Sequence, residues 1–317
     1  MKSLIIGAQI SGINPAIADA TVLERIAFAE QVGVECAWLT CGPTLADPLV
    51  TLGAAAIKTQ RIKLGTAVVP TFPRHPFAMV QSAMAVDALA PGRLRLGVGP
   101  SHQPFMEGMY GIPFERPLEF MREYLQVLRA ALYDGKVVHQ GKRFTLNAQF
   151  GPTKVTLLAS ALRANAFHLC GELADGAISW MCPLNYLRDV AVPALQEGAR
   201  SANRKTPPLI GHVPVIVSEN AEQVHALARE QFGMYARIPY YKAMITDAGF
   251  PEVGRGELSE KFIDELVVHG SAERVKQRLR TLPAYGISEL LATPMLPKAD
   301  PEAFARTIRA LGELAAE

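Results

Sequence analysis

The chain has 317 residues, of which 49% are hydrophobic and 20% are charged, and its formal net charge is +2. This composition can bury a large core and is unlike that of disordered chains. The small net charge excludes the strongly basic surface typical of nucleic-acid-binding proteins. No apolar run is long enough to span a bilayer, and the opening MKSLIIGAQISGINP lacks the cleavage site of a signal peptide. The sequence therefore predicts neither a nucleic-acid partner nor a membrane segment.

The cysteines point to a reducing compartment. Cys36, Cys41, Cys170 and Cys182 show no CxxC spacing, so they indicate neither a redox motif nor a zinc site. We expect reduced thiols, two of them ordinary core residues, and a cytoplasmic location.

Eight short apolar runs in chain order are strand candidates. They lie at residues 4–10, 35–39, 62–69, 94–98, 155–159, 176–180, 210–217 and 289–293. Most are continuously apolar rather than alternating, which favours parallel strands covered on both sides. Helix-type sequence separates them, so the pattern predicts an α/β fold, a (β/α)8 TIM barrel. An open doubly wound sheet is the alternative that strand number alone does not exclude.

Helix-start signals accompany this alternation. Thr21-Val-Leu-Glu24 reads as a capping box that opens a helix, which Gly33 ends. Asn220 and Ser271 precede two later helix patterns in the same way. The charged turn 73–76, PRHP, is expected to position the third helix rather than to carry chemistry.

Three segments exceed the simple alternation. They are 102–116 after the fourth strand, 137–152 before the fifth, which reads as a hairpin or an extended excursion, and 232–266 after the seventh. Long loops in a compact domain are usually lids or binding loops, and in a barrel the loops after strands lie at the catalytic face. No repeat or linker interrupts the chain, so we expect one domain over residues 1–317.

The segment 62–102 is the most distinctive part of the chain. It reads IKLGTAVVPTFPRHPFAMVQSAMAVDALAPGRLRLGVGPSH, and GIPFERP follows at 111–117. These motifs resemble the luciferase-like monooxygenase superfamily of flavin and deazaflavin oxidoreductases, most closely its coenzyme F420-dependent branch. The resemblance extends over nearly the whole chain and is strongest from residue 65 to 129. It implies a (β/α)8 barrel with the cofactor at the carboxyl ends of the strands.

The resemblance assigns roles to two loops of this segment. It implies a non-prolyl cis peptide bond between Ala67 and Val68, which forms a shelf behind the cofactor ring. It also places the loop 99–102 beside the ring, and His102 could polarise a substrate or relay a proton. The cofactor residues expected in that loop are Gly99, Pro100 and Ser101. An ordinary loop histidine bonded to backbone is the alternative for His102.

Two positions depart from the family pattern. Thr40 and Cys41 stand where deazaflavin-dependent members often carry Asp-His, which argues against sugar-phosphate or alcohol dehydrogenase chemistry that uses that pair. The loop before the GELADG motif at 171–176 would hold the cofactor phosphate, and Arg163 and Ala164 replace its expected Gly-Pro. Arg163 could supply a charge-assisted contact instead, or the site could be weakened. The resemblance also brings Ala159, Ser160 and Leu162 to the cofactor.

Aromatic residues complete the expected site. Trp180 ends the sixth strand, where the family contacts the cofactor edge. Phe105, Met109 and Tyr110 are the expected substrate contacts, joined by tyrosines at 235, 240 and 241 in the long insertion. A metal-binding pattern, a nucleophile elbow, a P-loop and a GxGxxG fingerprint are all absent from the sequence.

These observations predict a coenzyme F420-dependent oxidoreductase that transfers a hydride between the cofactor and a small organic substrate. One alternative is an FMN-dependent monooxygenase of a two-component system, supplied with reduced cofactor by a partner reductase. The other is a barrel that kept the fold but lost cofactor binding. The resemblance also implies a homodimer.

Overall fold

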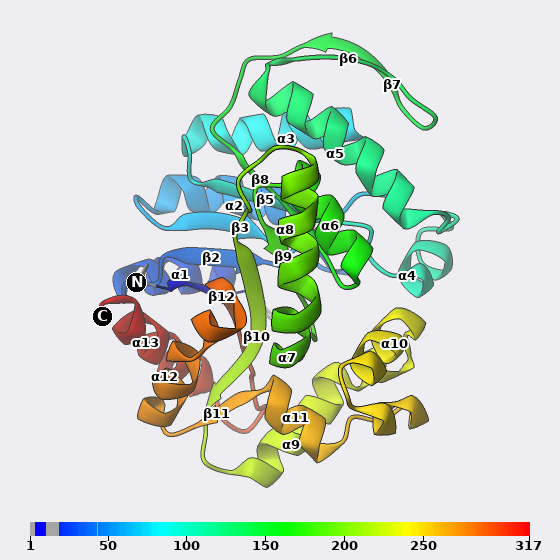
Figure 1. Cartoon of the computed structure of the whole chain (residues 1–317). Helices are drawn as coiled ribbons and strands as arrows, with labels where there is room; N and C mark the ends of the chain where they lie inside the picture. Colours follow the sequence, from blue (N-terminus) through cyan, green and yellow to red (C-terminus); the bar gives the residue numbers. More distant parts are fainter. Residues whose placement is uncertain (1–3, 11–18, 43) are drawn as a thin grey trace.

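Eight parallel strands close into a barrel in the computed structural model, which describes residues 4–10, 19–42 and 44–317 (Figure 1). In chain order they are β1 (Ile5–Gln9), β2 (Cys36–Leu39), β3 (Lys63–Thr66), β5 (Leu94–Gly99), β8 (Thr156–Ser160), β9 (Ala177–Ile178), β10 (Leu209–Val217) and β12 (Ile287–Pro294). Pairing of β10 with both β9 and β12 closes the ring. This confirms the predicted TIM barrel and all eight strand positions, and excludes the open sheet.

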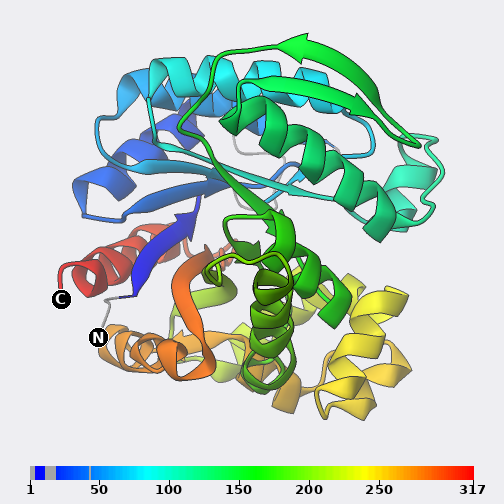
Figure 2. The ribbon, with the colours of Figure 1, turned by 45° about the horizontal axis from the view of Figure 1, so that its top comes forward.

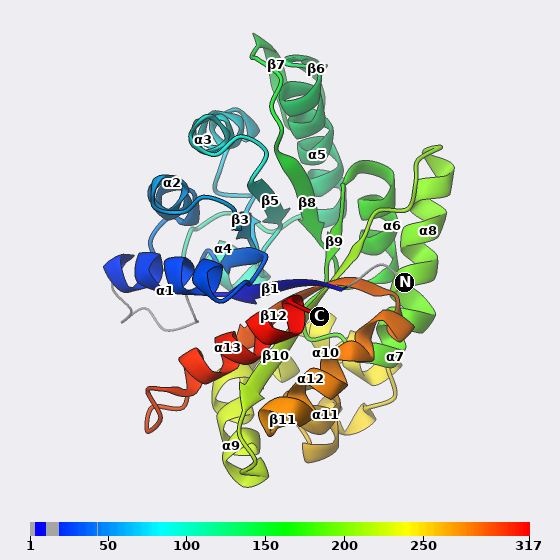
Figure 3. The same cartoon turned by 90° about the vertical axis from the view of Figure 1, so that its left-hand side faces the viewer.

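Helices surround the strands, as the view in Figure 3 shows. They are α1 (Asp19–Gln31), α2 (Pro48–Lys58), α3 (Pro76–Leu89), α5 (Pro117–Tyr133), α6 (Ala164–Leu173), α8 (Val192–Ser201), α9 (Ala221–Phe232), α12 (Ala272–Arg280) and α13 (Ala303–Ala315). Shorter turns complete the layer: α7 (Leu184–Tyr186) and the π-helical η1 (Leu187–Ala191) lead into α8, and η4 (Leu282–Tyr285) follows α12. Within the described ranges, no helix is both long and apolar enough to cross a membrane.

Most of the predicted helix starts are confirmed. Asn220 accepts the N–H of Gln223 at 3.0 Å, and Ser271 accepts that of Arg274 at 3.3 Å. His75 accepts the N–H of Phe77 at 3.2 Å, so the PRHP turn does cap α3. The capping box at Thr21 is wrong, because α1 already includes Asp19 and Thr21 lies inside the helix. A capping pattern marks a helix start only where the residues before it are not helical, and here Asp19 and Ala20 already belong to the helix.

The additional segments lie where the sequence predicts them, but one is less irregular than expected. The segment 102–116 contains a short helix, α4 (Gln103–Gly108), rather than loop alone. The predicted hairpin is formed by β6 (Lys136–Gln140) and β7 (Thr145–Gln149) and lies over α3 and α5 (Figure 2). The insertion after α9 folds as η2 (Gly233–Arg237), α10 (Pro239–Asp247), η3 (Pro251–Arg255) and α11 (Glu260–Leu266), before β11 (Val268–Gly270) pairs with β10.

Side chains fill the amino-terminal half of the barrel. Trp38 is fully buried, and a Cβ atom on Gly7 or Gly65 would lie within 2.4 Å or 2.2 Å of its ring. Arg95 lies over the same ring and forms a 2.6 Å ion pair with the buried Glu289. This packing leaves the carboxyl ends of the strands as the place for a cavity, as is usual in TIM barrels.

Candidate active site

A cavity of about 560 Å³ opens at the carboxyl ends of the barrel strands. This volume lies within the range of small-molecule sites. The expected site residues that line it are Thr40, Cys41, Ala67, Val68, Pro100, Ser101, His102, Phe105, Tyr110, Ala159, Ser160, Leu162, Arg163 and Trp180. Gly99, Ala164 and Met109 do not line it. The fold thus brings together residues from five separate regions of the chain, while their individual roles stay predictions.

One wall of the cavity is the break in the third barrel strand. The peptide bond between Ala67 and Val68 is cis, as the resemblance implies, and β4 (Val69–Pro70) resumes pairing directly after it. Thr40 donates a 3.2 Å hydrogen bond to the carbonyl oxygen of Ala67. A Cβ atom on Gly99 would lie 2.2 Å from Oγ of Ser160 and 2.8 Å from Val68. Glycine is therefore needed behind this wall even though it does not face the cavity.

His102 lies at the turn into α4 with its ring among aromatic side chains. Its centroid is 5.6 Å from Phe105, 5.8 Å from Tyr235 and 5.5 Å from Tyr241. The described residues give its side chain no hydrogen bond, so the structure does not support the backbone-bonded alternative. Burial lowers the pKa of His102 to about 4. The imidazole is therefore neutral at physiological pH and free to meet a ligand.

A second buried histidine at the cavity floor is a site residue that the sequence analysis missed. Nε2 of His212, on β10, lies 2.6 Å from Oγ1 of Thr293 and 3.1 Å from Oε1 of Gln9. The Thr293 hydroxyl itself donates to Oε1 of Gln9 at 2.9 Å, so its oxygen accepts from the histidine. Nε2 therefore carries the proton, and Nδ1 is a bare acceptor without a partner in the described part of the chain.

The surroundings keep His212 neutral as well. Its ring lies 4.2 Å from that of Trp180, and burial lowers its pKa to about 3. Gln9, His212 and Thr293 come from three strands that are far apart in sequence. The single signal that could have identified them is a polar side chain within each of three otherwise apolar strands.

Cys41 presents a thiol rather than a thiolate. Burial raises its pKa to about 11, with a further contribution from the carboxylate of Asp47. A thiol with a raised pKa is a weak nucleophile. The side chain of Cys41 therefore forms a small, neutral part of the cavity wall. All four cysteines are free, as the sequence predicts.

The expected phosphate loop ends in a helix terminus. Helix α6 begins at Ala164, and Arg163 precedes it without a side-chain cap. The amide of Ala166 donates to the carbonyl oxygen of Arg163 at 2.8 Å, so Ala164 and Asn165 supply the amides of α6 that have no intrahelical partner. Arg163 forms a 2.9 Å ion pair with Asp247, the last residue of α10, and both side chains are about half exposed. The insertion thus pairs the carboxylate of Asp247 with the guanidinium of Arg163, the group that would contact a cofactor phosphate.

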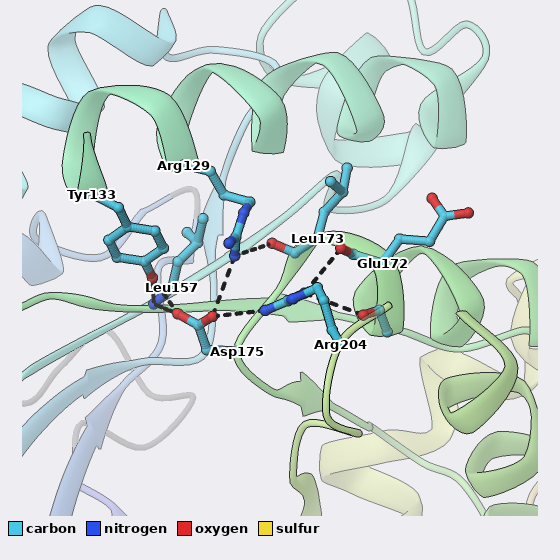
Figure 4. A network of polar contacts seen from close by, with 8 residues as sticks. Arg129, Tyr133, Leu157, Glu172, Leu173, Asp175 and Arg204 are labelled. Atoms are coloured by element: carbon cyan, nitrogen blue, oxygen red, sulfur yellow. Dashed lines mark hydrogen bonds and ion pairs between the residues drawn. The ribbon is translucent and has the colours of Figure 1, made fainter. Parts of the chain in front are cut away.

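The GELADG motif is structural rather than part of the cavity. Asp175 accepts hydrogen bonds from the Tyr133 hydroxyl, from Arg129 at 3.3 Å and from Arg204 at 3.1 Å (Figure 4). The N–H of Leu157 also donates to it at 3.2 Å. This carboxylate therefore joins α5, β8 and the segment after α8 behind the cavity wall.

Aromatic rings of the insertion cover the cavity. Tyr235 and Tyr241 pack with centroids 4.8 Å apart, and Tyr240 lies 6.5 Å from Phe114. In Figure 1, α10 lies beside α4 at the same end of the barrel. Phe105 is half-buried, whereas Met109, which directly follows α4, is 54% exposed. The expected apolar wall therefore exists, but it is built more by the insertion than by α4.

Comparison with known proteins identifies the family. The model of the luciferase-like monooxygenase family matches residues 7–289. An F420-dependent glucose-6-phosphate dehydrogenase of Beutenbergia cavernae is 28% identical over 313 residues, which cover 89% of each chain.

Two solved structures share the fold over almost the full length. An F420-dependent secondary alcohol dehydrogenase, in complex with an F420-acetone adduct, has a TM-score of 0.84 at 20% identity and covers 100% of both chains. The oxygenating constituent of 3,6-diketocamphane monooxygenase from Pseudomonas putida, in complex with FMN, has a TM-score of 0.76 at 17% identity. It covers 99% of this chain and 98% of that one. The expected enzyme class, an oxidoreductase or monooxygenase, is confirmed by the family match, and the chain belongs to the luciferase-like monooxygenase family.

Proposed function

We propose that this protein is a coenzyme F420-dependent oxidoreductase that acts on a small organic substrate. The observation that supports this most is the position of the cavity, between the cis peptide at Ala67 and Val68 and the uncapped amino terminus of α6. When bound, the deazaflavin supplies a ring that accepts or donates a hydride. Two relatives, one similar in sequence and one in structure, are named as F420-dependent.

The residues present fit such a cofactor. A planar ring needs a flat, small-residue wall, which Ala67, Val68 and Ala159 supply. A phosphate needs positive charge and N–H donors. The first amides of α6 would supply the donors, and Arg163 would supply the charge once the phosphate replaces Asp247 as its partner. Ser101 and Trp180 would lie at the ring edge, as the family resemblance implies.

The remaining residues control protons and water. His102 is neutral, so it can accept the proton of a substrate hydroxyl or donate a hydrogen bond to a carbonyl oxygen. Tyr241 is buried and Tyr235 is half-buried, and their rings close the cavity toward the insertion. Excluding water in this way strengthens the polar contacts inside and fixes the substrate orientation.

An FMN-dependent monooxygenase is the second candidate. Thr40 and Cys41 replace the Asp-His pair that deazaflavin enzymes often carry, and one structural relative is in complex with FMN. This candidate would depend on a partner reductase for reduced cofactor. The third candidate, a barrel without cofactor chemistry, is supported by the ion pair that occupies Arg163.

Titration of the purified protein with coenzyme F420 and separately with FMN, followed by calorimetry, tests these candidates. Preferential binding of F420 supports the proposal, preferential binding of FMN supports the monooxygenase, and binding of neither supports the third candidate. Arg163→Gln should weaken cofactor binding without changing thermal stability, because the side chain is half exposed.

The homodimer, the single domain over residues 1–317 and the cytoplasmic location stay predictions. Light scattering of the purified protein tests the homodimer. Limited proteolysis tests the domain prediction, since a single domain should resist cleavage except at loops.

A further inference from the structure

The cavity almost entirely lacks charged groups. Arg163, at the rim, is the one residue with a permanently charged side chain among the described residues that line it, and Asp247 already neutralises it at 2.9 Å. Residues 11–18 and 43, which lie outside the described ranges, include no Asp, Glu, Lys, Arg or His in the sequence.

The nearest other charges are also paired. Arg74 and Asp47 act on Cys41 electrostatically from behind the cavity wall, and they form an ion pair with each other. The opposite charges of an ion pair largely cancel, so this pair exerts little net electrostatic field on a ligand on the other side of the cavity wall. Neither member lines the cavity.

The polar atoms that do face the cavity are neutral. Burial keeps the imidazoles of His102 and His212 uncharged, and it raises the pKa of the Cys41 thiol and of the Tyr241 hydroxyl. Nδ1 of His212 is an acceptor in the described structure, and the ring of His102 has no hydrogen-bond partner there. Each of these imidazoles offers a hydrogen bond to a small uncharged polar group, such as a hydroxyl or carbonyl oxygen.

We infer that the substrate of this site is an uncharged, largely apolar organic molecule with a hydroxyl or carbonyl oxygen, and not a phosphorylated, carboxylated or cationic metabolite. A charged ligand would lose its hydration shell on entering and would find no free counter-charge to replace it. The rings of Tyr235 and Tyr241 pack directly against each other, so this pair does not offer both ring faces to a cation. The inference rests on the proposed function in one respect: it takes the molecule that binds in the cavity to be the substrate of the proposed reaction.

Binding of shape-matched probes tests this inference without any measurement of turnover. The first pair is 4-tert-butylacetophenone and 4-acetyl-N,N,N-trimethylanilinium, which differ in charge but hardly in shape. The second pair is methyl 4-acetylbenzoate and the 4-acetylbenzoate anion. Each is titrated by calorimetry into the cofactor-free protein and into the protein saturated with F420.

The two neutral ketones should bind at least about tenfold more tightly than their charged partners. Equal or tighter binding of either charged probe overturns the inference, and so does failure of both neutral ketones to bind to cofactor-free and to F420-saturated protein. A protein that binds the neutral ketones but not F420 supports the inference and contradicts the proposed function instead.

Fluorescence locates the bound probe. Of the two tryptophans, Trp180 lines the cavity, whereas Trp38 is fully buried within the barrel. A neutral ketone in the cavity should quench the emission of Trp180, and Trp180→Phe should remove most of that quenching. Quenching that persists in Trp180→Phe would place the ligand elsewhere and overturn the assignment to this cavity.

Discussion

Polar side chains play opposite roles in two regions of the molecule, one around Asp175 and one around the cavity histidines His102 and His212. Asp175 receives four donors, from Tyr133, Arg129, Arg204 and the N–H of Leu157, so its oxygens are fully occupied (Figure 4). His102 has no hydrogen-bond partner in the described part of the chain, and His212 uses one nitrogen of two. The first arrangement joins secondary-structure elements, and the second leaves polar atoms available to a ligand.

This difference shows that some sequence motifs stabilise the fold, whereas others line the cavity. The GELADG motif, although diagnostic of the family, lies behind the cavity wall and holds α5, β8 and α6 together. The GPSH motif forms part of the wall itself. A polar group that is saturated within the fold stabilises it, whereas one left open in an apolar cavity is retained at the expense of stability.

The largest expected effect is on activity at His102. His102→Gln should reduce kcat/KM for a substrate of the F420-linked reaction by about 10²-fold or more, because it removes the proposed proton-handling group. Its melting temperature should stay close to that of the wild type, since the side chain makes no hydrogen bond within the described residues. Steady-state kinetics and thermal unfolding measured together check this, and unchanged kinetics would contradict the role of His102.

The opposite pattern is expected at Asp175. Asp175→Asn should lower the free energy of unfolding by about 2 kcal/mol, because two arginines and a tyrosine lose their charged acceptor. Cofactor affinity should change little, since Asp175 does not line the cavity. Urea unfolding measures this, with Glu197→Gln, which breaks an exposed ion pair, as the matched control with a much smaller effect. Equal effects of the two substitutions would argue against a special role for the network.

Acid stability should reveal the buried histidines. The pKa of His212 falls from 6.5 in the unfolded chain to about 3 in the fold, and that of His102 to about 4. The unfolded chain therefore binds more protons than the folded protein between these pH values. The contribution of the two neutral histidines to the free energy of unfolding is complete above pH 6.5 and is lost as the pH falls toward 4. Melting temperatures measured from pH 7 to pH 4.5 should drop less steeply in His212→Gln than in the wild type. Parallel curves would show that His212 is not kept neutral by the fold.

The smallest effect concerns the ion pair at the rim. Asp247→Asn should tighten F420 binding about threefold, because Arg163 is then free to meet a phosphate. Asp189→Asn breaks another exposed ion pair away from the cavity and serves as the control that should leave binding unchanged. Weaker F420 binding by Asp247→Asn would mean that Asp247 orients Arg163 rather than competing for it.

Much of the architecture was predictable from local patterns. Eight apolar runs separated by helix-type sequence predict the barrel, because strand and helix periodicities are properties of short segments. The motifs around residues 62–102 identify the family, and through it the cis peptide at Ala67 and Val68 and most of the cavity lining. Asn220 and Ser271 were recognised as caps because a capping bond spans only three residues.

Other features depend on contacts that no local pattern contains. Gln9, His212 and Thr293 are separated by 203 and 81 residues along the chain, and only the closure and register of the barrel bring them to one hydrogen-bonded cluster. Likewise, Arg163 meets Asp247 only because the insertion folds back over the cavity. The sequence alone therefore determined the order of the elements and the family. Tertiary structure decided which polar groups are satisfied and which stay open, because burial and pairing are properties of the assembled barrel.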